Sequence, residues 1–204
     1  AAAREAGRAL GGAVETGSVR WNLLAGTVEL RDVSLRGKGE RAGTEISVAR
    51  ARADLSLRAL LRGRVVVESA LVEGPVVRVA LGADGRLILP FVVPPSEDRG
   101  PKERPDVEVR GLRLSKGRLE LTDRGEAGRR VDVSDVSLEG SLDLRALASS
   151  GTLTLDGIDV ASAGHEPLRG SFLSARWRTR GETASATARL VAKEAGLTAD
   201  LLAE

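Results

Sequence analysis

The sequence contains no cysteine and no methionine, and only 2% of its residues are aromatic. Without cysteine there are no disulfides, zinc-ribbon sites or thiol nucleophiles. Aromatic residues are scarce, and the 31 basic and 29 acidic residues are mixed along the chain. Both features argue against nucleic-acid binding, which relies on base stacking and concentrated positive charge. We therefore expect no metal, no cofactor and no nucleic-acid partner.

The sequence also lacks any apolar run near the roughly 20 residues that span a bilayer. It begins with alanine and has no initiator methionine, so we expect a fragment of a longer chain. Residues 1–14 are rich in helix-forming residues, although three glycines weaken the pattern. They predict a short N-terminal helix, which is either a terminal helix or the stub that follows a membrane anchor missing from this chain.

Residues that could perform catalysis are scarce. The single histidine, His165, lies in a polar loop, with no second histidine or cysteine to complete a metal site or activate a nucleophile. Carboxylates such as Glu29 and Asp132 fall at outward positions of strands, where they solubilise the chain. The Gly-Lys-Gly at 37–39 lacks the rest of a phosphate-binding loop. We expect that the protein is not an enzyme.

Apolar residues at every second position are abundant, and this is the spacing of half-buried strands. Residues 54–81 show it best, as a strand, one helical turn at 58–62, and a strand that resumes the alternation through Leu81. Two alternating runs around Gly26 predict a hairpin, and Asp84 and Gly85 predict a tight turn before Leu87.

One ten-residue pattern of apolar positions recurs along the chain, at 28–37, 65–74, 107–116, 131–140 and 153–162. Residues 65–79 match residues 107–121 without a gap, because Val107 stands 42 positions after Val65. Residues 54–60 recur in the same way at 141–147. The repetition predicts one supersecondary unit used several times.

Each repeat shifts the alternation by one residue, since Leu30 and Val33 are three positions apart. In a plain strand the second half would then face the other way. An extra residue would keep the apolar residues on one face as a β-bulge, which also bends the strand. The expected bulges are at Asp32, Ser69, Gly111, Asp135 and Gly157. The alternative is that each break is a turn between two short strands.

The apolar residues would form one broad aliphatic face, with each side chain worth about 1.5 to 3 kcal/mol when buried. No helix expected from the sequence is long enough to cover that face. This leaves a second sheet, closure of the sheet on itself, or an apolar ligand. The candidate lining residues are Val28, Leu30, Val33, Leu35, Val65, Val67, Val72, Val77, Val79, Leu81, Val107, Val109, Leu112, Leu114, Val131, Val133, Val136 and Leu138.

Five of the 7 prolines lie in residues 90–106, which predicts a long surface loop there. The repeat restarts directly afterwards at Val107. We therefore expect residues 15–204 to be one continuous, mostly β structure of repeated, curved antiparallel strands, interrupted by this loop.

Residues 17–95 resemble the AsmA-like family, and most of all the membrane-proximal part of its TamB branch. The likeness lies in the stretch TGSVRWNLLAGTVELRDVSLRG, the corner DLSLRALL, the strand that runs through Gly74 and Pro75, and the Asp84-Gly85 hairpin. After residue 95 only the strand repeat carries it. The family's anchor helix is absent, and the chain is far shorter than a protein that crosses the periplasm.

The resemblance implies an elongated, taco-like β-groove with an aliphatic interior. It also implies anchoring in the inner membrane of a Gram-negative bacterium, through a segment outside this chain, and extension through the periplasm. The implied function is a lipid-transfer bridge that shields phospholipid acyl chains on the way toward the outer membrane. For the TamB branch it adds a barrel-shaped outer-membrane partner.

Two other functions fit the same residues. A structural or assembly module would aid the insertion of outer-membrane proteins through exposed sheet edges. An ordinary β-sandwich that binds a protein or a glycan would cover the aliphatic face with another sheet.

Overall fold

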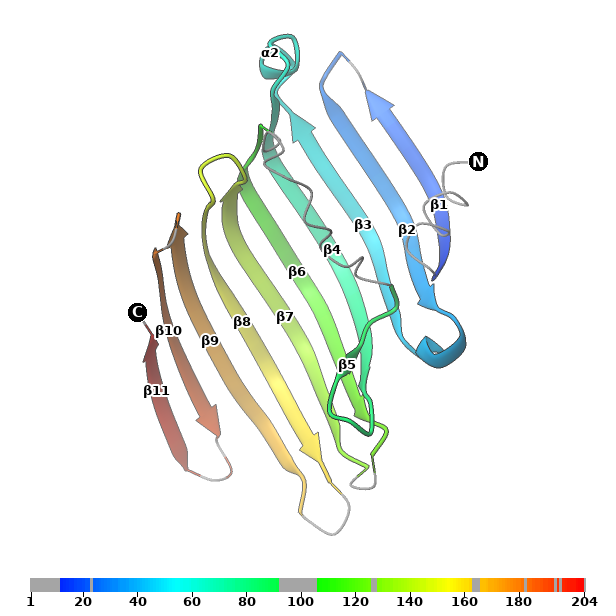
Figure 1. Ribbon diagram of the computed structural model, residues 1–204, viewed down its shortest axis with the longest axis vertical. Helices are drawn as coiled ribbons and strands as arrows, with labels where there is room; N and C mark the ends of the chain where they lie inside the picture. The colour runs from blue at the N-terminus through cyan, green and yellow to red at the C-terminus, as the bar shows by residue number, and fades with distance from the viewer. Residues whose placement is uncertain are drawn as a thin grey trace.

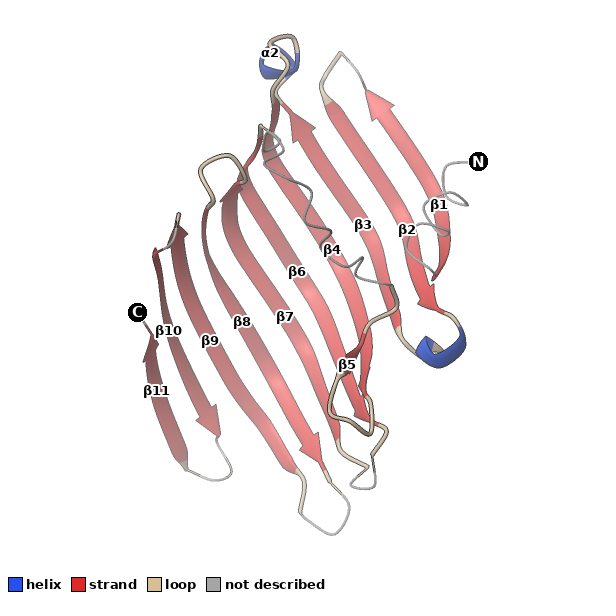
Figure 2. Cartoon of the chain, viewed as in Figure 1, coloured by secondary structure: helices blue, strands red, loops and turns tan. Residues whose placement is uncertain are grey.

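The computed structural model describes residues 12–22, 24–91, 106–125, 128–162, 166–181, 183–192, 194 and 196–203. They form one open, curved sheet of 11 strands with almost no helix (Figures 1 and 2). The elements are β1 (Gly12–Asn22), β2 (Thr27–Gly37), η1 (Gly39–Arg41), β3 (Glu45–Leu55), α2 (Leu57–Leu60), β4 (Val65–Leu81), β5 (Leu87–Ile88), β6 (Val107–Asp123), β7 (Arg130–Asp143), β8 (Ala148–Ala161), β9 (Leu168–Arg180), β10 (Thr183–Ala192) and β11 (Leu197–Ala203).

The strand order follows the sequence almost throughout, as β1-β2-β3-β4-β6-β7-β8-β9-β10-β11, with β5 paired to β4 beside this path. All neighbours are antiparallel except β4 and β6, which run parallel. The expectation of antiparallel strands throughout was therefore wrong at this one place. β5 pairs with the end of β4, whereas β6 starts level with the beginning of β4.

The 42-residue repeat coincides with the register of this parallel pair. Val65 lies beside Val107 and Val77 beside Leu119, and the same offset holds to Leu81 and Asp123. Residues of one repeat thus lie beside their own counterparts in the next. At the aliphatic positions of the repeat, such as Val72 and Leu114, apolar side chains therefore lie beside apolar side chains.

The predicted turns are confirmed. Gly26, with φ of 64°, lies in the β1–β2 hairpin. Gly85, with φ of 75°, lies in the β4–β5 turn, where the Gly82 amide donates to the Arg86 carbonyl at 2.8 Å. The helical turn predicted at 58–62 is α2, placed one residue earlier, and the Ser56 amide ties this corner to the Val66 carbonyl at 2.9 Å.

The short helix expected at residues 1–14 is wrong at its end. Residues 1–11 lie outside the described residues, but Gly12, Ala13 and Val14 belong to β1 and pair with Gly37, Arg36 and Leu35 of β2. Pairing with a neighbouring strand overrides the helix propensity of an alanine-rich segment that glycines already weaken. The expected polar loop at His165 and most of the proline-rich loop, residues 92–105, also lie outside the described residues.

Bulges occur where the alternation shifts. Two residues of one strand oppose one residue of the next at Arg110–Gly111, at Ser134–Asp135 and at Asp156–Gly157, and Glu68 is the extra residue beside Ser69. The strands continue through these places, so the alternative of a turn between two short strands is wrong. These four bulges confirm the parity argument.

Asp32 differs from the other four positions. Its φ of 51° is left-handed, yet the register of β2 is the same on both sides of it, with β1 and with β3. The expected bulge there is wrong, because the neighbouring strands carry matching residues, Gly17 and Ala49, at the same level. The alternation shifts at the same level in β1, β2 and β3, so none of the three strands has an extra, unpaired residue there.

A line of residues, most of them with left-handed φ, crosses the sheet from Asp32. At the same level of the register lie Ala49 in β3, Gly74 in β4 with φ of 60°, and Lys116 in β6 with φ of 55°. Gly157 in β8, with φ of 62°, lies a little further along, level with Ser134 in β7 and Arg118 in β6. We call this set of five residues the bend line. It divides β2, β3, β4, β6 and β8 into two halves each.

Little of the protein is buried. Among the described hydrophobic residues, only Val66, Val79, Ala80, Val133 and Ala192 are. The accessible surface is 13865 Å² for a chain of 21.4 kDa, about half as much again as the roughly 9,100 Å² of a compact monomer of that mass. The single layer of strands leaves both of its faces largely uncovered.

Candidate functional site

The strand register places the aliphatic residues in rows that cross the sheet. Residues directly opposite each other on neighbouring strands point to the same face. The two longest rows are Leu30, Ala51, Val72, Leu114, Leu138 and Leu153 on one side of the bend line, and Leu35, Ile46, Val77, Leu119, Val133 and Ile158 on the other. We call these, with the parallel rows beside them, the aliphatic rows.

The structure brings the predicted lining residues together on β2, β4, β6 and β7. Val28 and Leu112 belong to a row through Ala53 and Ala70. Val65 lies beside Val107, Val67 beside Val109, and Val79 and Val131 lie on either side of Leu121. Val33 of β2 and Val136 of β7 lie at one level of the register, with β3, β4 and β6 between them. Leu81 is the exception, because its neighbours are Leu87 and Asp123, which puts it at the margin of the rows.

Most of the predicted lining residues are half-buried. Val79 and Val133 are buried, at 7% and 2% exposure, while Val65 is exposed. The remaining members are intermediate, since neighbours in the same row cover their flanks but no second layer covers their ends. The rows thus form an apolar surface that the described residues leave open.

Side-chain contacts link the two halves of the aliphatic rows across the bend line. Leu114 and Gly117 lie on opposite sides of Lys116 in β6. A Cβ atom added to Gly117 would lie 3.1 Å from Cδ2 of Leu114 and 2.9 Å from Cβ of Val136. Leu114 therefore points to the face that Gly117 and Val136 share. At this strand the left-handed residue keeps the aliphatic side chains on one side of the sheet.

Sequence reasoning missed the contributions of β3, β8 and β9. Ile46 and Val48 in β3, Leu155 and Ile158 in β8, and Leu173 in β9 extend the same rows. Their signal was present, because each strand alternates in the same way as the repeats. Only the register shows that they are level with the predicted residues.

The face opposite the aliphatic rows carries charges in ladders. Glu15 of β1, Arg36 of β2, Glu45 of β3, Arg78 of β4 and Glu120 of β6 form a continuous chain of ion pairs, with N–O distances of 3.5, 3.2, 2.8 and 3.0 Å. The hydrogen bonds and charges of Glu120, and then of Glu45, raise the pKa of the Arg78 guanidinium above its usual range. Five strands are linked by side chains of alternating sign.

A second ladder lies on the other side of the bend line. Arg31 and Arg50 both approach Glu29, at 2.6 and 3.2 Å, and Arg50 also approaches Glu73 at 3.6 Å. The hydrogen bond from Arg31 lowers the pKa of the Glu29 carboxyl, and Arg50 adds to this effect. Opposite charges on neighbouring strands contribute roughly 0.2 to 1 kcal/mol per pair. In β2 and β3, the arginines of this ladder are thus neutralised by glutamates of the same or a neighbouring strand.

Two other features are absent from the described ranges. These ranges hold no group of three or more histidine, cysteine, aspartate or glutamate side chains that could bind a metal ion. Nor do they contain a helix of the length and apolar character needed to cross a membrane.

Comparison with known proteins gives no family. No protein-family model, curated protein or solved structure matches the chain.

Proposed function

We propose that this chain is the periplasmic segment of a lipid-transfer bridge anchored in the inner membrane, in which the aliphatic rows line a β-groove that shields phospholipid acyl chains. The headgroups stay in water at the open side of the groove, and the lipid moves toward the outer membrane. The resemblance of residues 17–95 to the AsmA-like family suggests this role.

The observation that carries the proposal is the open apolar surface. Aliphatic side chains from β2 to β9 lie in continuous rows and remain half-exposed. A contiguous apolar surface of this size is unusual on a protein that stands alone, and it marks a place where an apolar partner binds. Acyl chains suit a surface made of valine, leucine and alanine with few polar atoms.

A second sheet does not cover this surface within the described residues, which form one sheet only. The sandwich interpretation requires Val65 to Val72 to face another sheet, so the described part of the chain does not support it. Closure of the sheet on itself is not seen either, because the strand order ends at β1 and β11.

The test compares two neighbouring residues of β7 that lie on opposite faces. Leu138→Asp places a charge among the aliphatic rows, and Ser137→Asp places the same charge on the other face. Because one such aliphatic contact is worth about 1.5 to 3 kcal/mol, we expect Leu138→Asp to lower phospholipid affinity about tenfold or more. Ser137→Asp should retain the lipid. Phospholipid that remains bound to protein purified from membranes is measured by native mass spectrometry.

Folding of the variants is checked by circular dichroism. Leu35→Asp, in β2 on the other side of the bend line, provides a second variant if Leu138→Asp does not fold. Purified wild-type protein that carries no phospholipid would contradict the proposal, as would equal loss of lipid from Leu138→Asp and Ser137→Asp.

The second candidate function is an assembly module that presents sheet edges to outer-membrane proteins. The observation that favours it is β11, which pairs only with β10 among the described strands and exposes Leu201 and Leu202 at 68% and 71%. An unpaired edge with exposed leucines can accept another strand.

A further inference from the structure

Three arginines of β9 lie on the charged face without a carboxylate partner. Arg176, Arg178 and Arg180 alternate along the strand, so their side chains share a face. In the part of the chain that the structure describes, no carboxylate oxygen lies within 4.0 Å of any of them. The arginines of the two ladders, by contrast, all pair with glutamates.

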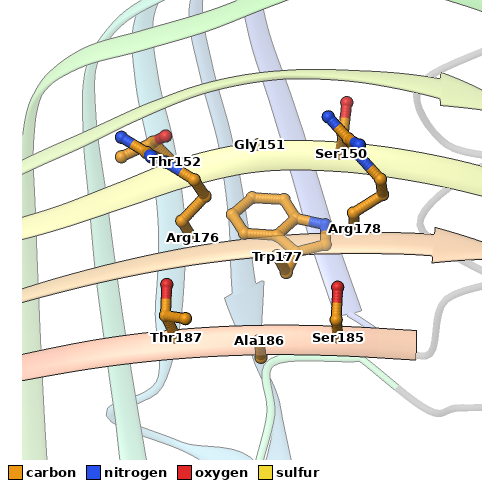
Figure 3. A pocket seen from close by; sticks show the side chains of 9 residues that line it. All are labelled: Ser150, Gly151, Thr152, Arg176, Trp177, Arg178, Ser185, Ala186 and Thr187. Atoms are coloured by element: carbon orange, nitrogen blue, oxygen red, sulfur yellow. The ribbon is translucent and has the colours of Figure 1, made fainter. Parts of the chain in front are cut away.

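Two of these arginines flank a shallow depression of about 370 Å³. Register places Arg176 between Thr152 and Thr187, and Arg178 between Ser150 and Ser185. Figure 3 shows the two rows side by side, with Thr187 and Ser185 pointing the same way and Ala186 pointing away between them. The depression is therefore lined by two guanidinium groups and four hydroxyl groups.

Nearby acidic groups are already engaged. Glu139 lies beside Thr152 in the register, and its carboxylate contacts Arg113 at 2.9 Å. Asp200 of β11 lies 3.9 Å from Arg189. Glu108 and Asp143 line the neighbouring depression with Arg178, but no described carboxylate lies within 4.0 Å of Arg176 or Arg178. No carboxylate lines this depression itself, and Arg176 and Arg178 repel each other.

The spacing suits an oxyanion. Alternate residues of a strand are about 7 Å apart, so one tetrahedral group can accept hydrogen bonds from both arginines. The guanidinium fork matches the oxygens of a phosphate, and the hydroxyl groups supply further donors. A phosphate between the arginines would also remove their mutual repulsion.

We propose that this depression binds a phosphate group, carried either by a small phosphate ester or by a phospholipid headgroup. The site goes beyond the lipid-groove function, because it lies on the face opposite the aliphatic rows. It does not require acyl chains to bind those rows.

Trp177 offers a nearby readout from the same strand, with its indole on the face opposite the two arginines, against Gly151. It lies between the two arginines in sequence, and its indole Nε1–H donates to the Ser149 hydroxyl at 3.3 Å. In a Trp21→Phe background the remaining indole N–H signal in a nitrogen–proton NMR spectrum belongs to Trp177, since the chain has two tryptophans. The titrants are glycerol 3-phosphate and, at equal ionic strength, sodium chloride. Vesicles of phosphatidylcholine, with and without phosphatidylglycerol, test the headgroup by flotation.

The double variant Arg176→Gln/Arg178→Gln removes the site. Its matched control is Arg20→Gln/Arg118→Gln, which removes two exposed arginines that have no carboxylate partner among the described residues and lie on different strands, β1 and β6. We expect the double variant to weaken binding at least tenfold and the control to change it less than twofold. Circular dichroism shows whether both variants fold.

The outcomes separate the two sources of phosphate. A saturable shift with glycerol 3-phosphate that is lost in the double variant supports a site for small esters. Flotation only with phosphatidylglycerol, lost in the double variant, supports a headgroup site. The proposal is overturned if neither probe binds, or if the control loses as much binding as the double variant.

Discussion

Asp54 shows how a single side chain on the charged face links three strands. Its carboxylate accepts hydrogen bonds from Ser69 Oγ of β4 at 2.7 Å, from Thr27 Oγ1 of β2 at 3.1 Å and from Arg52 of its own strand at 3.0 Å. The Ser69 hydroxyl is the largest cause of the lowered pKa of the Asp54 carboxyl, with Arg52 and Thr27 adding to it.

Removal of the Ser69 hydroxyl should therefore raise the pKa of Asp54 toward its ordinary value. A depressed pKa in the folded state adds stability above the unfolded-state pKa and loses it as the pH falls through the folded value. We expect Ser69→Ala to lower the free energy of unfolding at neutral pH by less than about 1 kcal/mol, because the carboxylate is partly exposed.

The measurements are urea unfolding as a function of pH and the NMR titration of the Asp54 carboxyl carbon. The stability difference between wild type and Ser69→Ala should shrink as the pH falls below the lowered pKa. Ser115→Ala, on β6, is the control and should leave the Asp54 titration unchanged. A pKa that does not rise in Ser69→Ala would contradict this account.

At the scale of elements, β6 has two glycines that differ in their surroundings, Gly111 in a bulge and Gly117 opposite Val136. A Cβ atom at Gly117 would lie 2.9 Å from both Cβ and the carbonyl oxygen of Val136, closer than real Cβ contacts allow. At Gly111 the nearest atom would be the Glu68 carbonyl oxygen at 3.4 Å, an ordinary contact. Neither glycine has a positive φ, so only the available space distinguishes them.

Alanine at these two positions should have opposite effects. Gly117→Ala overpacks the contact with β7, which typically costs about 1 to 3 kcal/mol. Gly111→Ala should be neutral or stabilise the protein by up to about 1 kcal/mol, because alanine restricts the unfolded chain. Chemical denaturation of both variants checks this. Equal destabilisation of the two would mean that the close approach of β6 and β7 at Gly117 is not essential.

The sequence predicted where strands and bulges lie better than it predicted the backbone conformation at individual residues. Shifted alternation located the bulges at Gly111, Asp135 and Gly157, because keeping aliphatic residues on one face requires an extra residue there. It placed a bulge wrongly at Asp32, since it could not see that Gly17 and Ala49 change at the same level. It also gave no sign that Lys116 adopts a left-handed φ, which a lysine side chain does not favour.

The candidate sites differ in how far they could be predicted. The aliphatic residues of β2, β4, β6 and β7 follow from alternation alone. The β9 arginines were missed, although the run Arg-Trp-Arg-Thr-Arg at 176–180 is visible in the sequence. What distinguishes them is the lack of carboxylates opposite them, and that depends on the register of β8, β9 and β10.

At the scale of the whole molecule, the face and the edges of the sheet offer different partners different places to bind. A photo-crosslinker at Leu138 lies on the aliphatic rows, and one at Leu202 lies on the edge strand β11. If the protein conducts lipid, phospholipid should label the Leu138 position, with little at Leu202. Mass spectrometry of adducts formed in cells measures both.

The same experiment tests the assembly function. Labelling of nascent outer-membrane proteins at Leu202, without lipid at Leu138, would favour the edge over the groove. Ser137, next to Leu138 but on the opposite face, is the control position for lipid labelling. Equal lipid adducts at Leu138 and Ser137 would show that neither face is selective.

The topology was predicted less well than the strands. The 42-residue offset was visible in the sequence, but it does not say whether the matched segments run parallel or antiparallel. That depends on where the chain goes between Ile88 and Val107, a stretch whose prolines prevent strand pairing without fixing a direction. Paired residues of β4 and β6 are 42 positions apart, which is also the spacing of the repeat. The repeat therefore predicts which residues lie side by side, but not whether the two strands run parallel.

The single-layered sheet also determines how many residues the protein uses to span a given distance across its strands. Ten strands along the path, spaced about 4.8 Å apart, advance the structure by about 43 Å in the hydrogen-bonding direction. An α-helix would cover that length with about 29 residues. In return the sheet is broad, since strands of 11 to 17 residues such as β1 and β4 are about 36 to 56 Å long. The sheet therefore uses many more residues than a helix to span the same distance, and in exchange it forms a broad continuous surface.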